Sequence, residues 1–231
     1  MRIYQNFEEA YADIERELVK FGVTIKTTSH QNLANENNPK YYTKELQGYG
    51  FTVLNSQFQD AISHVHKEHQ KWVADELDER LFTEGNPGTN WLKRKEYWEQ
   101  FMVDGKFHYS YPERMKKYIN DVITCLINDP FSRRAILSVW DQKEDGPNIH
   151  QLARVSCSMY YQLLYREGKL DIIYTMRSTD FYEHFRNDCA LACGFRDFIA
   201  SQLGMKIGRF QLFAGSLHAY NKDLPKEQQV V

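Results

Sequence analysis

The feature that most constrains the fold is a run of 23 residues, 156–178, with the sequence SCSMYYQLLYREGKLDIIYTMRS. Its many β-branched and aromatic residues favour extended strands. The Glu167-Gly168 pair near its middle is typical of a tight turn. We therefore predict two long strands joined by a turn. Because apolar residues occupy nearly every position, both faces of this hairpin are expected to be covered.

Helical patterns precede this hairpin. Apolar residues recur at helical spacing between Asn6, a suitable N-cap, and Gly22, which stops the run. A polar stretch of helical composition runs over 56–81 and ends at the breaker EGNPG. A further helix fits PERMKKYINDVITCLIND, which has apolar residues along one side.

Two further strands and one central helix are predicted on either side of this hairpin. AILSVWD and IGRFQLFAGSLHAY are predicted strands. The stretch after Asp188, CALACGFRDFIASQLG, is apolar or small on most sides and ends at Gly204, so it predicts a buried helix. No repeat or long linker interrupts the chain. We expect one mixed α+β domain over residues 1–231.

Composition excludes several classes of protein. The net charge of −2 gives no overall attraction to nucleic acid or anionic membranes. No run approaches the roughly 18 apolar residues that a membrane span needs. The charged N-terminus does not resemble a secretory signal peptide, and four cysteines in a chain of this size are expected to be reduced thiols. We therefore expect a cytoplasmic protein that binds neither membranes nor nucleic acid directly.

Two clusters superficially suggest a metal. Cys189 and Cys193 lie near His184, but structural zinc sites take four ligands and the sequence offers no second pair. Small buried residues on a helix are the favoured interpretation, since free cysteine behaves as a small hydrophobe. The histidines of HVHKEH, 64–69, are surrounded by polar residues and favour a solvated helix. No metal is expected.

Other residues each allow two interpretations. Arg133 and Arg134 are either surface charges or a bidentate grip on phosphate. Cys157 is either a core residue or a nucleophile, which a positive environment would activate. His218 and Tyr220 share a strand face, because side chains alternate. They suit either a polar ligand or a half-exposed sheet edge.

Taken in order, these fragments resemble the thymidylate synthase family over about residues 105–221. The resemblance is carried by DPFSRRAILSVWD, by a glutamine five residues after Cys157, by Arg-Ser-x-Asp twenty residues after that cysteine, by FRND, and by His-x-Tyr on the last strand. It implies a large mixed β-sheet packed with helices and a sheet-to-sheet homodimer.

The resemblance also implies catalytic roles. Cys157 corresponds to the nucleophile that adds to C6 of a pyrimidine, so that C5 can attack the methylene carbon of 5,10-methylenetetrahydrofolate. Tyr111 corresponds to a tyrosine in proton transfer at C5, and Asp180 to a carboxylate near the base and the folate. Trp98 is a weaker match to an aromatic residue near the folate. Glu68 is a weak match to a catalytic glutamate, since it lies four residues before a tryptophan instead of three.

The nucleotide would be held by a second group of residues. The resemblance assigns the phosphate to Arg177 and Ser178, the phosphate of the neighbouring subunit to Arg133 and Arg134, and the sugar hydroxyl to His218 and Tyr220, with Gln162 among the substrate-binding residues.

Asp188 distinguishes the pyrimidine base. It lies eleven residues after Arg177, where synthases that use deoxyuridylate have asparagine. An ionised carboxylate only accepts hydrogen bonds, which suits the 4-amino group of cytosine and opposes O4 of uracil. FRND followed by GSLH also resembles the bacteriophage deoxycytidylate hydroxymethylases. The expected reaction converts dCMP and methylenetetrahydrofolate to 5-hydroxymethyl-dCMP and tetrahydrofolate. Alternatives are a hydroxymethylase or methylase of dUMP or CMP, and an inactive nucleotide-binding homologue.

Two departures from the family pattern accompany this resemblance. Ser158 replaces the histidine that often follows the nucleophile in the synthases. Eleven residues follow Tyr220, so we expect the segment that closes over folate to be short or absent.

Overall fold

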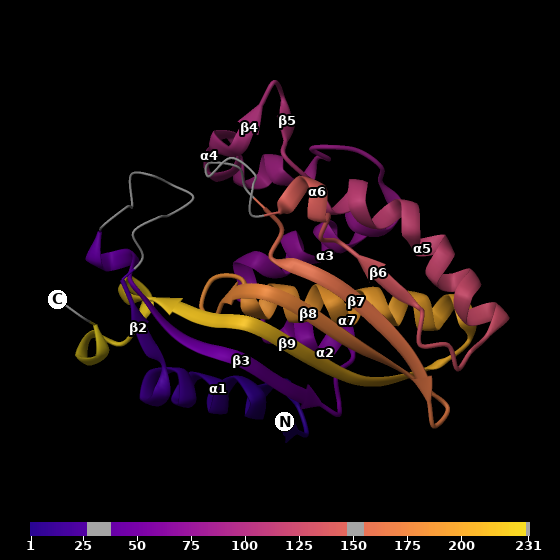
Figure 1. The fold of residues 1–231 in the computed structure, drawn as a ribbon, viewed down its shortest axis with the longest axis horizontal. Coiled ribbons are helices and arrows are strands. Elements are labelled where there is room, and N and C mark those ends of the chain that lie inside the picture. Colours follow the sequence, from indigo (N-terminus) through magenta and orange to yellow (C-terminus); the bar gives the residue numbers. More distant parts are fainter. Residues whose placement is uncertain (27–37, 147–154, 230–231) are drawn as a thin grey trace.

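The computed structural model describes residues 1–26, 38–146 and 155–229. Seven strands form one sheet in the order β1-β3-β9-β8-β7-β6, with β2 on β3, and β4 and β5 form a small separate pair (Figure 1). Strand pairs β1–β3 and β8–β9 are parallel and the others are antiparallel. The predicted mixed α+β architecture is confirmed. The strands are β1 (Arg2–Tyr4), β2 (Val23–Ile25), β3 (Thr43–Val53), β4 (Met102–Val103), β5 (Lys106–Phe107), β6 (Ile136–Ser138), β7 (Ser158–Arg166), β8 (Lys169–Asp180) and β9 (Lys206–Tyr220).

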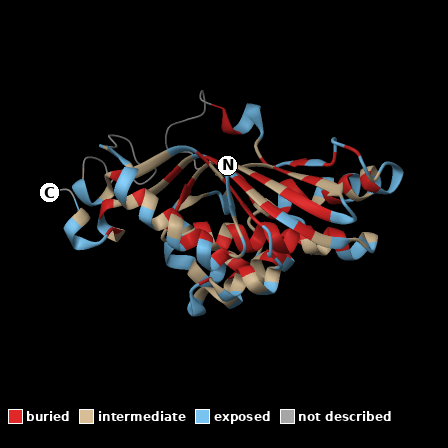
Figure 2. Cartoon of the chain, turned by 90° about the horizontal axis from the view of Figure 1, so that it is seen from below, coloured by how far each residue is buried: buried red, intermediate tan, exposed pale blue. Residues whose placement is uncertain are grey.

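The helices lie mainly on one side of the large sheet (Figure 2). They are α1 (Phe7–Phe21), α2 (Phe58–Ser63), α3 (Lys67–Phe82), α4 (Lys95–Trp98), α5 (Tyr111–Asn128), α6 (Gln142–Asp145) and α7 (Phe185–Leu203). Short 3₁₀ turns cover Pro39–Tyr41, Asn90–Arg94, Glu99–Phe101, Asn221–Asp223 and Lys226–Gln228.

Local signals set several boundaries as predicted. The Asn6 side chain accepts a hydrogen bond from the amide of Glu9, 2.9 Å away, and α1 ends before Gly22. The turn between β7 and β8 has positive φ angles at both Glu167 (53°) and Gly168 (76°). Two consecutive residues with positive φ form the tight hairpin turn whose twist matches that of the strands.

Helix α7 is the centre of the hydrophobic core, as its composition predicted. Cys189 and Cys193 are fully buried on it, as the packing interpretation requires. The apolar pattern was followed only after Asp188, but the FRND motif opens the helix: α7 begins at Phe185, so Asp188 lies in its first turn. The amide of Asp188 already donates to the carbonyl of His184, 2.9 Å away. His184 makes no capping hydrogen bond through its side chain, so the sequence carried no start signal there.

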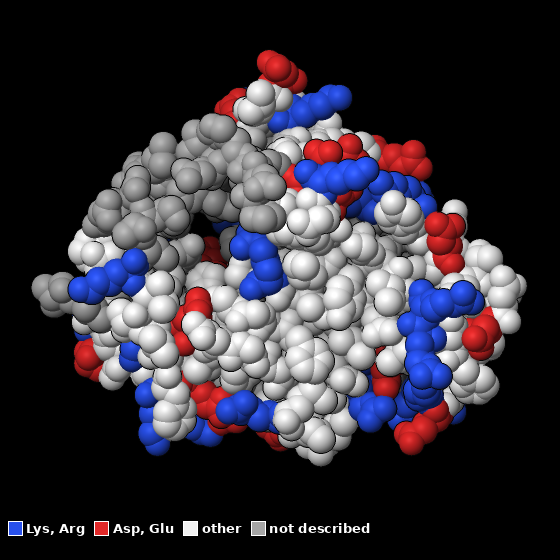
Figure 3. Space-filling model, viewed as in Figure 1, with Lys and Arg blue, Asp and Glu red and all other residues white. Residues whose placement is uncertain are grey.

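The two faces of the sheet differ. On β9, Phe210, Leu212 and Ala214 are buried on the helix side, whereas Phe213 between them is 42% exposed. The sequence predicted cover on both faces of the β7–β8 hairpin. In the described part of the chain the helices cover one face (Figure 2). The centre of the other face carries few charged side chains (Figure 3).

In both β8 and β9 the alternation of buried and exposed side chains is interrupted, and the interruptions lie at paired positions of the two strands. Met176 and Thr179 are buried on β8 whereas Arg177 and Ser178 are half-buried, and β9 repeats this between Ala214 and Leu217. The pairing of β7 with β8 is also irregular at Ser158. Such irregularities re-aim side chains beside functional sites. Here they bring Arg177 and Ser178 next to Cys157.

Candidate active site around Cys157

Cys157 is half-buried and immediately precedes β7. Its carbonyl accepts a hydrogen bond from the Arg177 amide, 2.8 Å away. Its Sγ lies 3.7 Å from Nη2 of Arg177 and 3.9 Å from Oγ of Ser178. A guanidinium and a hydroxyl at these positions can stabilise negative charge on the sulfur. The thiol therefore has the surroundings of a nucleophile.

Backbone carbonyls hold the Arg177 guanidinium in place. Nε donates to the carbonyl of Ser156 at 2.8 Å, and Nη2 donates to the carbonyl of Val155 at 3.3 Å. Nη1 donates to Oγ of Ser178 at 3.0 Å. A cation held by neutral groups keeps its charge available for an anion such as phosphate. Arg154, which the sequence also puts near the thiol, lies outside the described residues.

Tyr111 begins α5 and reaches the same place. Its hydroxyl lies 3.1 Å from Oγ of Ser158, the residue after the thiol. The Arg80 guanidinium lies over its ring, with Cζ 3.7 Å from the ring centroid. Burial raises the pKa of Tyr111, Arg80 opposes that rise, and the charges of Cys157 and Asp188 add to it. The phenol is therefore within electrostatic reach of both the thiol and Asp188.

Asp188 connects α7 with β8. Its Oδ2 accepts a hydrogen bond from Oγ1 of Thr179, which is buried, at 3.2 Å. This contact ties the carboxylate to the sheet. It gives the candidate site an acceptor group.

The end of the β8–β9 pair adds a second polar group. The parallel register puts Asp180 opposite His218, and the rings of His218 and Tyr220 lie 5.6 Å apart. The predicted shared face of His218 and Tyr220 is thus confirmed. Burial raises the pKa of Asp180 to about 7, and Asp223 contributes to the rise. Burial also raises the pKa of Tyr220, with further contributions from Asp180, Tyr97 and Cys157.

Trp98 lies in an aromatic cluster at the end of α4. Its ring centroid is 5.0 Å from that of Tyr97 and 6.1 Å from that of Phe107. Tyr97 in turn raises the pKa of Tyr220. Tyr97 links this cluster electrostatically to Tyr220.

Four predicted residues lie apart from the thiol within one chain. Glu68 is exposed in the first turn of α3. Arg133 and Arg134 are exposed before β6, and the Gln162 amide donates to the carbonyl of Arg133 at 2.9 Å. Gln162 follows Cys157 by five residues along β7, a distance of roughly 16 Å in a strand. Within a single chain, therefore, no contact with the thiol supports the predicted roles of these four residues.

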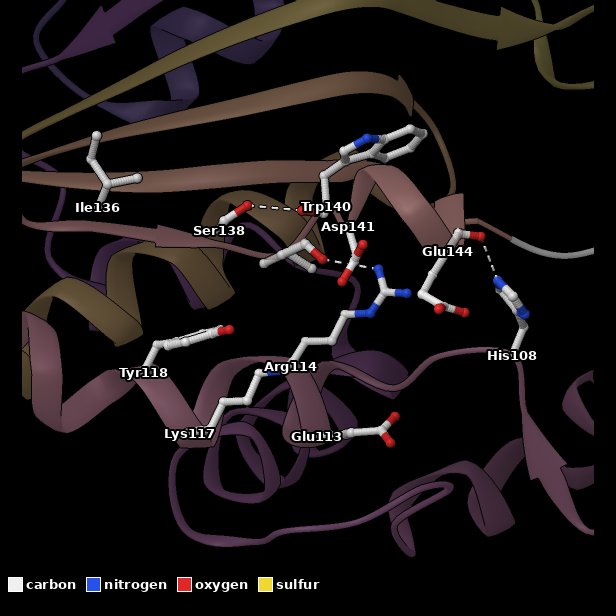
Figure 4. Close-up of a pocket in the computed structure, with 11 residues that line it drawn as sticks. His108, Glu113, Arg114, Lys117, Tyr118, Ile136, Ser138, Trp140, Asp141 and Glu144 are labelled. Atoms are coloured by element: carbon white, nitrogen blue, oxygen red, sulfur yellow. Dashed lines mark hydrogen bonds between the residues drawn. The ribbon is translucent and has the colours of Figure 1, made fainter. Parts of the chain in front are cut away.

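A separate hollow of about 380 Å³ lies between α5, β6 and α6 (Figure 4). Arg114 reaches into it from α5, but this cation is already paired with Asp145 and donates to the carbonyl of Val139. None of the residues predicted for the site lines this hollow. The lining residues are His108, Glu113, Arg114, Lys117, Tyr118, Ile136, Ser138, Val139, Trp140, Asp141 and Glu144.

Residues 1–26, 38–146 and 155–229 contain no group of three or more His, Cys, Asp or Glu side chains placed to hold a metal ion. Among the helices in those ranges, none combines the length and apolar character needed to cross a bilayer.

The sequence interpretation missed three contributors to the site: Arg80, Thr179 and Tyr174, whose hydroxyl forms a hydrogen bond with Oγ of Ser158. Arg80 pairs with Glu76 four residues earlier on α3, a spacing that is usual for solvated surface pairs. Thr179 occupies the variable position of the Arg-Ser-x-Asp motif. For Tyr174 the available sequence signal was Ser158. This serine stands where the synthases often have histidine, and its hydroxyl needs a hydrogen-bond partner, which Tyr174 supplies.

The model of the thymidylate synthase family matches residues 19–231. The chain belongs to the thymidylate synthase family. A putative thymidylate synthase from Methanothermobacter marburgensis is 30% identical over 147 residues, which is 60% of this chain and 64% of the relative. The thymidylate synthase of Corynebacterium aurimucosum is 24% identical over 161 residues, 64% of this chain and 59% of the relative. The matched segments span less than two thirds of these relatives' length.

Membership of the thymidylate synthase family agrees with the mixed sheet and the helices packed on it. These relatives carry the name thymidylate synthase or putative thymidylate synthase, and neither is named a hydroxymethylase.

Proposed function

We propose that this chain transfers a hydroxymethyl group to C5 of dCMP, using 5,10-methylenetetrahydrofolate and water. The observation that carries the proposal is the carboxylate of Asp188, 3.2 Å from Oγ1 of Thr179 and within electrostatic reach of Tyr111. A fixed acceptor suits the 4-amino group of cytosine. It opposes O4 of uracil, because mismatched buried polar groups discriminate strongly.

The proposed reaction begins at the thiol. Cys157 adds to C6, and C5 then attacks the methylene carbon of the folate. C5 loses its proton as the folate nitrogen leaves, and water adds to the exocyclic methylene carbon. Loss of the thiolate from C6 restores the ring. The cation of Arg177 next to Cys157 favours both the attack and the departure of the sulfur.

The remaining polar groups are proposed to hold the nucleotide. Arg177 and Ser178 would bind its phosphate, and His218 and Tyr220 its sugar hydroxyl. Asp180 and Trp98 border the position proposed for the folate. With its pKa raised to about 7, Asp180 can exchange a proton near neutral pH.

We also propose a homodimer joined through the uncovered face of the sheet. Phe213 is exposed there, and its ring lies over Gly50, where a Cβ atom would be 2.8 Å from Phe213 Cδ1. Few charges lie near the centre of this face (Figure 3). In such a dimer Arg133 and Arg134 are proposed to reach the partner's phosphate. The chain's four free thiols suit a reducing compartment, so the cytoplasm is the proposed location.

Tritium at C5 of dCMP tests the proposal. Incubation with methylenetetrahydrofolate should release tritium, and the product mass should show a hydroxymethyl group, which exceeds a methyl group by one oxygen. Cys157→Ser should abolish release, whereas Cys125→Ser, a free thiol on α5, should retain it.

Three outcomes oppose the proposal. A methylated product or a preference for dUMP or CMP would identify a different reaction of the same family. Nucleotide binding without tritium release would identify a binding protein that lacks turnover.

A further inference from the structure

A chain of buried hydroxyl groups leads away from the candidate site. Oγ of Ser158 lies 3.1 Å from the Tyr111 hydroxyl and also forms a hydrogen bond with the hydroxyl of Tyr174. Ser158 and Tyr174 are both fully buried. If Tyr174 donates to Ser158 and Ser158 donates to Tyr111, the hydrogen of the Tyr111 hydroxyl points away from this chain of hydroxyl groups and is free for another acceptor.

A buried ion pair covers the same phenol from the other side. Arg80, 5% exposed, lies 3.7 Å above the Tyr111 ring. Its Nε donates to Oε1 of Glu76 at 2.8 Å, and the other carboxylate oxygen accepts from the Asn90 amide at 3.0 Å. Taking an ion pair out of water costs free energy. A stacked, hydrogen-bonded guanidinium is fixed in both position and charge.

We propose that Arg80, Ser158 and Tyr174 are positioning residues that hold the Tyr111 hydroxyl for proton exchange at C5 of the pyrimidine. The proposal rests on the proposed function, because it assumes that a substrate carbon reacts beside Cys157. None of these three residues is proposed to touch the substrate. Each acts through Tyr111.

The proton count of the step is balanced. When the bond from the methylene carbon to the folate nitrogen breaks, its electron pair goes to that nitrogen, which needs a proton. The C5–H electrons form the exocyclic double bond, and the C5 proton goes to the Tyr111 oxygen. Tyr111 gives its own proton to the nitrogen, so the phenol ends as it began. Negative charge that develops on its oxygen is stabilised by Arg80 and by the Ser158 hydroxyl.

The charged and titratable groups around Tyr111 are Arg80 with its partner Glu76 on α3, Cys157 before β7, Tyr161 on β7, Tyr174 on β8 and Asp188 on α7. Arg80 on α3 favours the phenolate, whereas Asp188 on α7 and Cys157 before β7 disfavour it. Removing the Arg80 charge should therefore raise the pKa of Tyr111. Removing the Ser158 hydroxyl should act in the same direction, because its hydrogen bond also favours the phenolate.

The first test measures Tyr111 in the free protein. 3-Fluorotyrosine at position 111 reports the titration of its phenol by ¹⁹F NMR. Arg80→Met should move this titration to higher pH, and Tyr174→Phe should move it in the same direction by less. Arg80→Met alone leaves the Glu76 carboxylate buried without its cation, which can prevent folding. The double variant Glu76→Gln with Arg80→Met removes both charges and avoids this cost. Lys117→Met is the matched control, since Lys117 lies over the exposed ring of Tyr118 on the same helix.

The second test measures tritium release. The paired variant should lower kcat by roughly 10- to 100-fold while KM for dCMP changes little. In a Tyr111→Phe background the same pair should cause no further loss, because its effect passes through the phenol.

The two proposals fail separately. An unchanged ¹⁹F titration in folded Arg80→Met and Tyr174→Phe proteins, or an equal loss of activity with and without the Tyr111 hydroxyl, would overturn the positioning role. Absence of tritium release from the unaltered protein, with the ¹⁹F shift as expected, would instead overturn the proposed function.

Discussion

Asp188 differs from asparagine by one terminal group, and we propose that this group decides which base is accepted. In the structure Thr179 fixes the carboxylate from the sheet side. Asp188→Asn supplies a donor as well as an acceptor, which matches O4 and N3–H of uracil. We expect the ratio of kcat/KM for dCMP over dUMP to fall by at least about 100-fold. Tritium release from each C5-labelled nucleotide measures this ratio.

Asp121→Asn makes the same chemical change at an exposed position of α5 and should leave the ratio unaltered. If Asp188→Asn lowers turnover of both nucleotides equally, Asp188 has a general role and does not select the base.

Asp180 should make stability depend on pH. Its pKa is raised from 3.8 to about 7, mainly by burial, so the folded protein binds a proton that the unfolded chain releases above about pH 4. The stabilisation is complete below the unfolded pKa and is lost as pH rises through about 7. It amounts to at most about 4 kcal/mol.

Urea unfolding at several pH values, with Asp180→Asn as the comparison, measures this effect. The wild-type free energy of unfolding should fall relative to that of the variant between pH 4 and 7. A difference that is constant across this range would contradict the raised pKa.

At the scale of elements, Arg196 fastens α7 to the rest of the fold. It is fully buried and donates to Oγ of Ser56 at 2.9 Å and to the carbonyl of Gly208 at 3.1 Å. The neighbouring Asp197 accepts from Arg196 and from the Phe58 amide at the start of α2. Arg196→Met should lower the free energy of unfolding by about 3–5 kcal/mol, because it leaves buried acceptors unsatisfied and removes the cation that pairs with Asp197.

Arg209→Met is the matched control. Arg209 pairs with Asp171 on the next strand, but its side chain is 44% exposed. The Arg209→Met variant should lose no more than about 1 kcal/mol of the free energy of unfolding, measured by chemical denaturation. Equal losses in the two variants would show that burial is not what gives Arg196 its effect.

Elements with local signals were predictable from the sequence, and those without them were not. α1 has a capping Asn6, and the hairpin turn has Gly168, so both were located correctly. The start of α7 is set by packing of Phe185 in the core. No short-range pattern encodes that packing, so the apolar pattern was followed only after Asp188.

The candidate site was predictable where spacing carried the information. Cys157, Arg177 and Ser178 were singled out from the motifs, and the structure brings them together. Arg80 could not be found this way. Glu76 and Arg80 have the spacing of a solvated pair, and only the fold shows that α3 turns this pair inward onto Tyr111.

For the whole molecule, sharing of residues between subunits can be tested by mixing. A Cys157→Ser chain and a chain with Arg133→Ala and Arg134→Ala should each be inactive or weak alone. In a mixed dimer, one site combines an intact thiol with the partner's intact arginines. Refolding the two together in equal amounts should restore about one quarter of wild-type sites.

Sedimentation of the same mixture checks that dimers have formed, and Phe213→Asp should shift them to monomers if the uncovered face is the interface. Dimers that form without recovery of activity would show that the arginines act elsewhere.

The position of β9 has a consequence for synthesis of the protein. It follows the other strands in chain order, yet it pairs with β3 on one side and with β8 on the other. While a ribosome is still making these residues, both neighbours present long unpaired edges, which are templates for aggregation. Completion of β9 closes both edges and delivers His218 and Tyr220 to the site in the same event. A nascent chain should therefore need protection by chaperones until this strand emerges, and nucleotide binding would report that the sheet is closed.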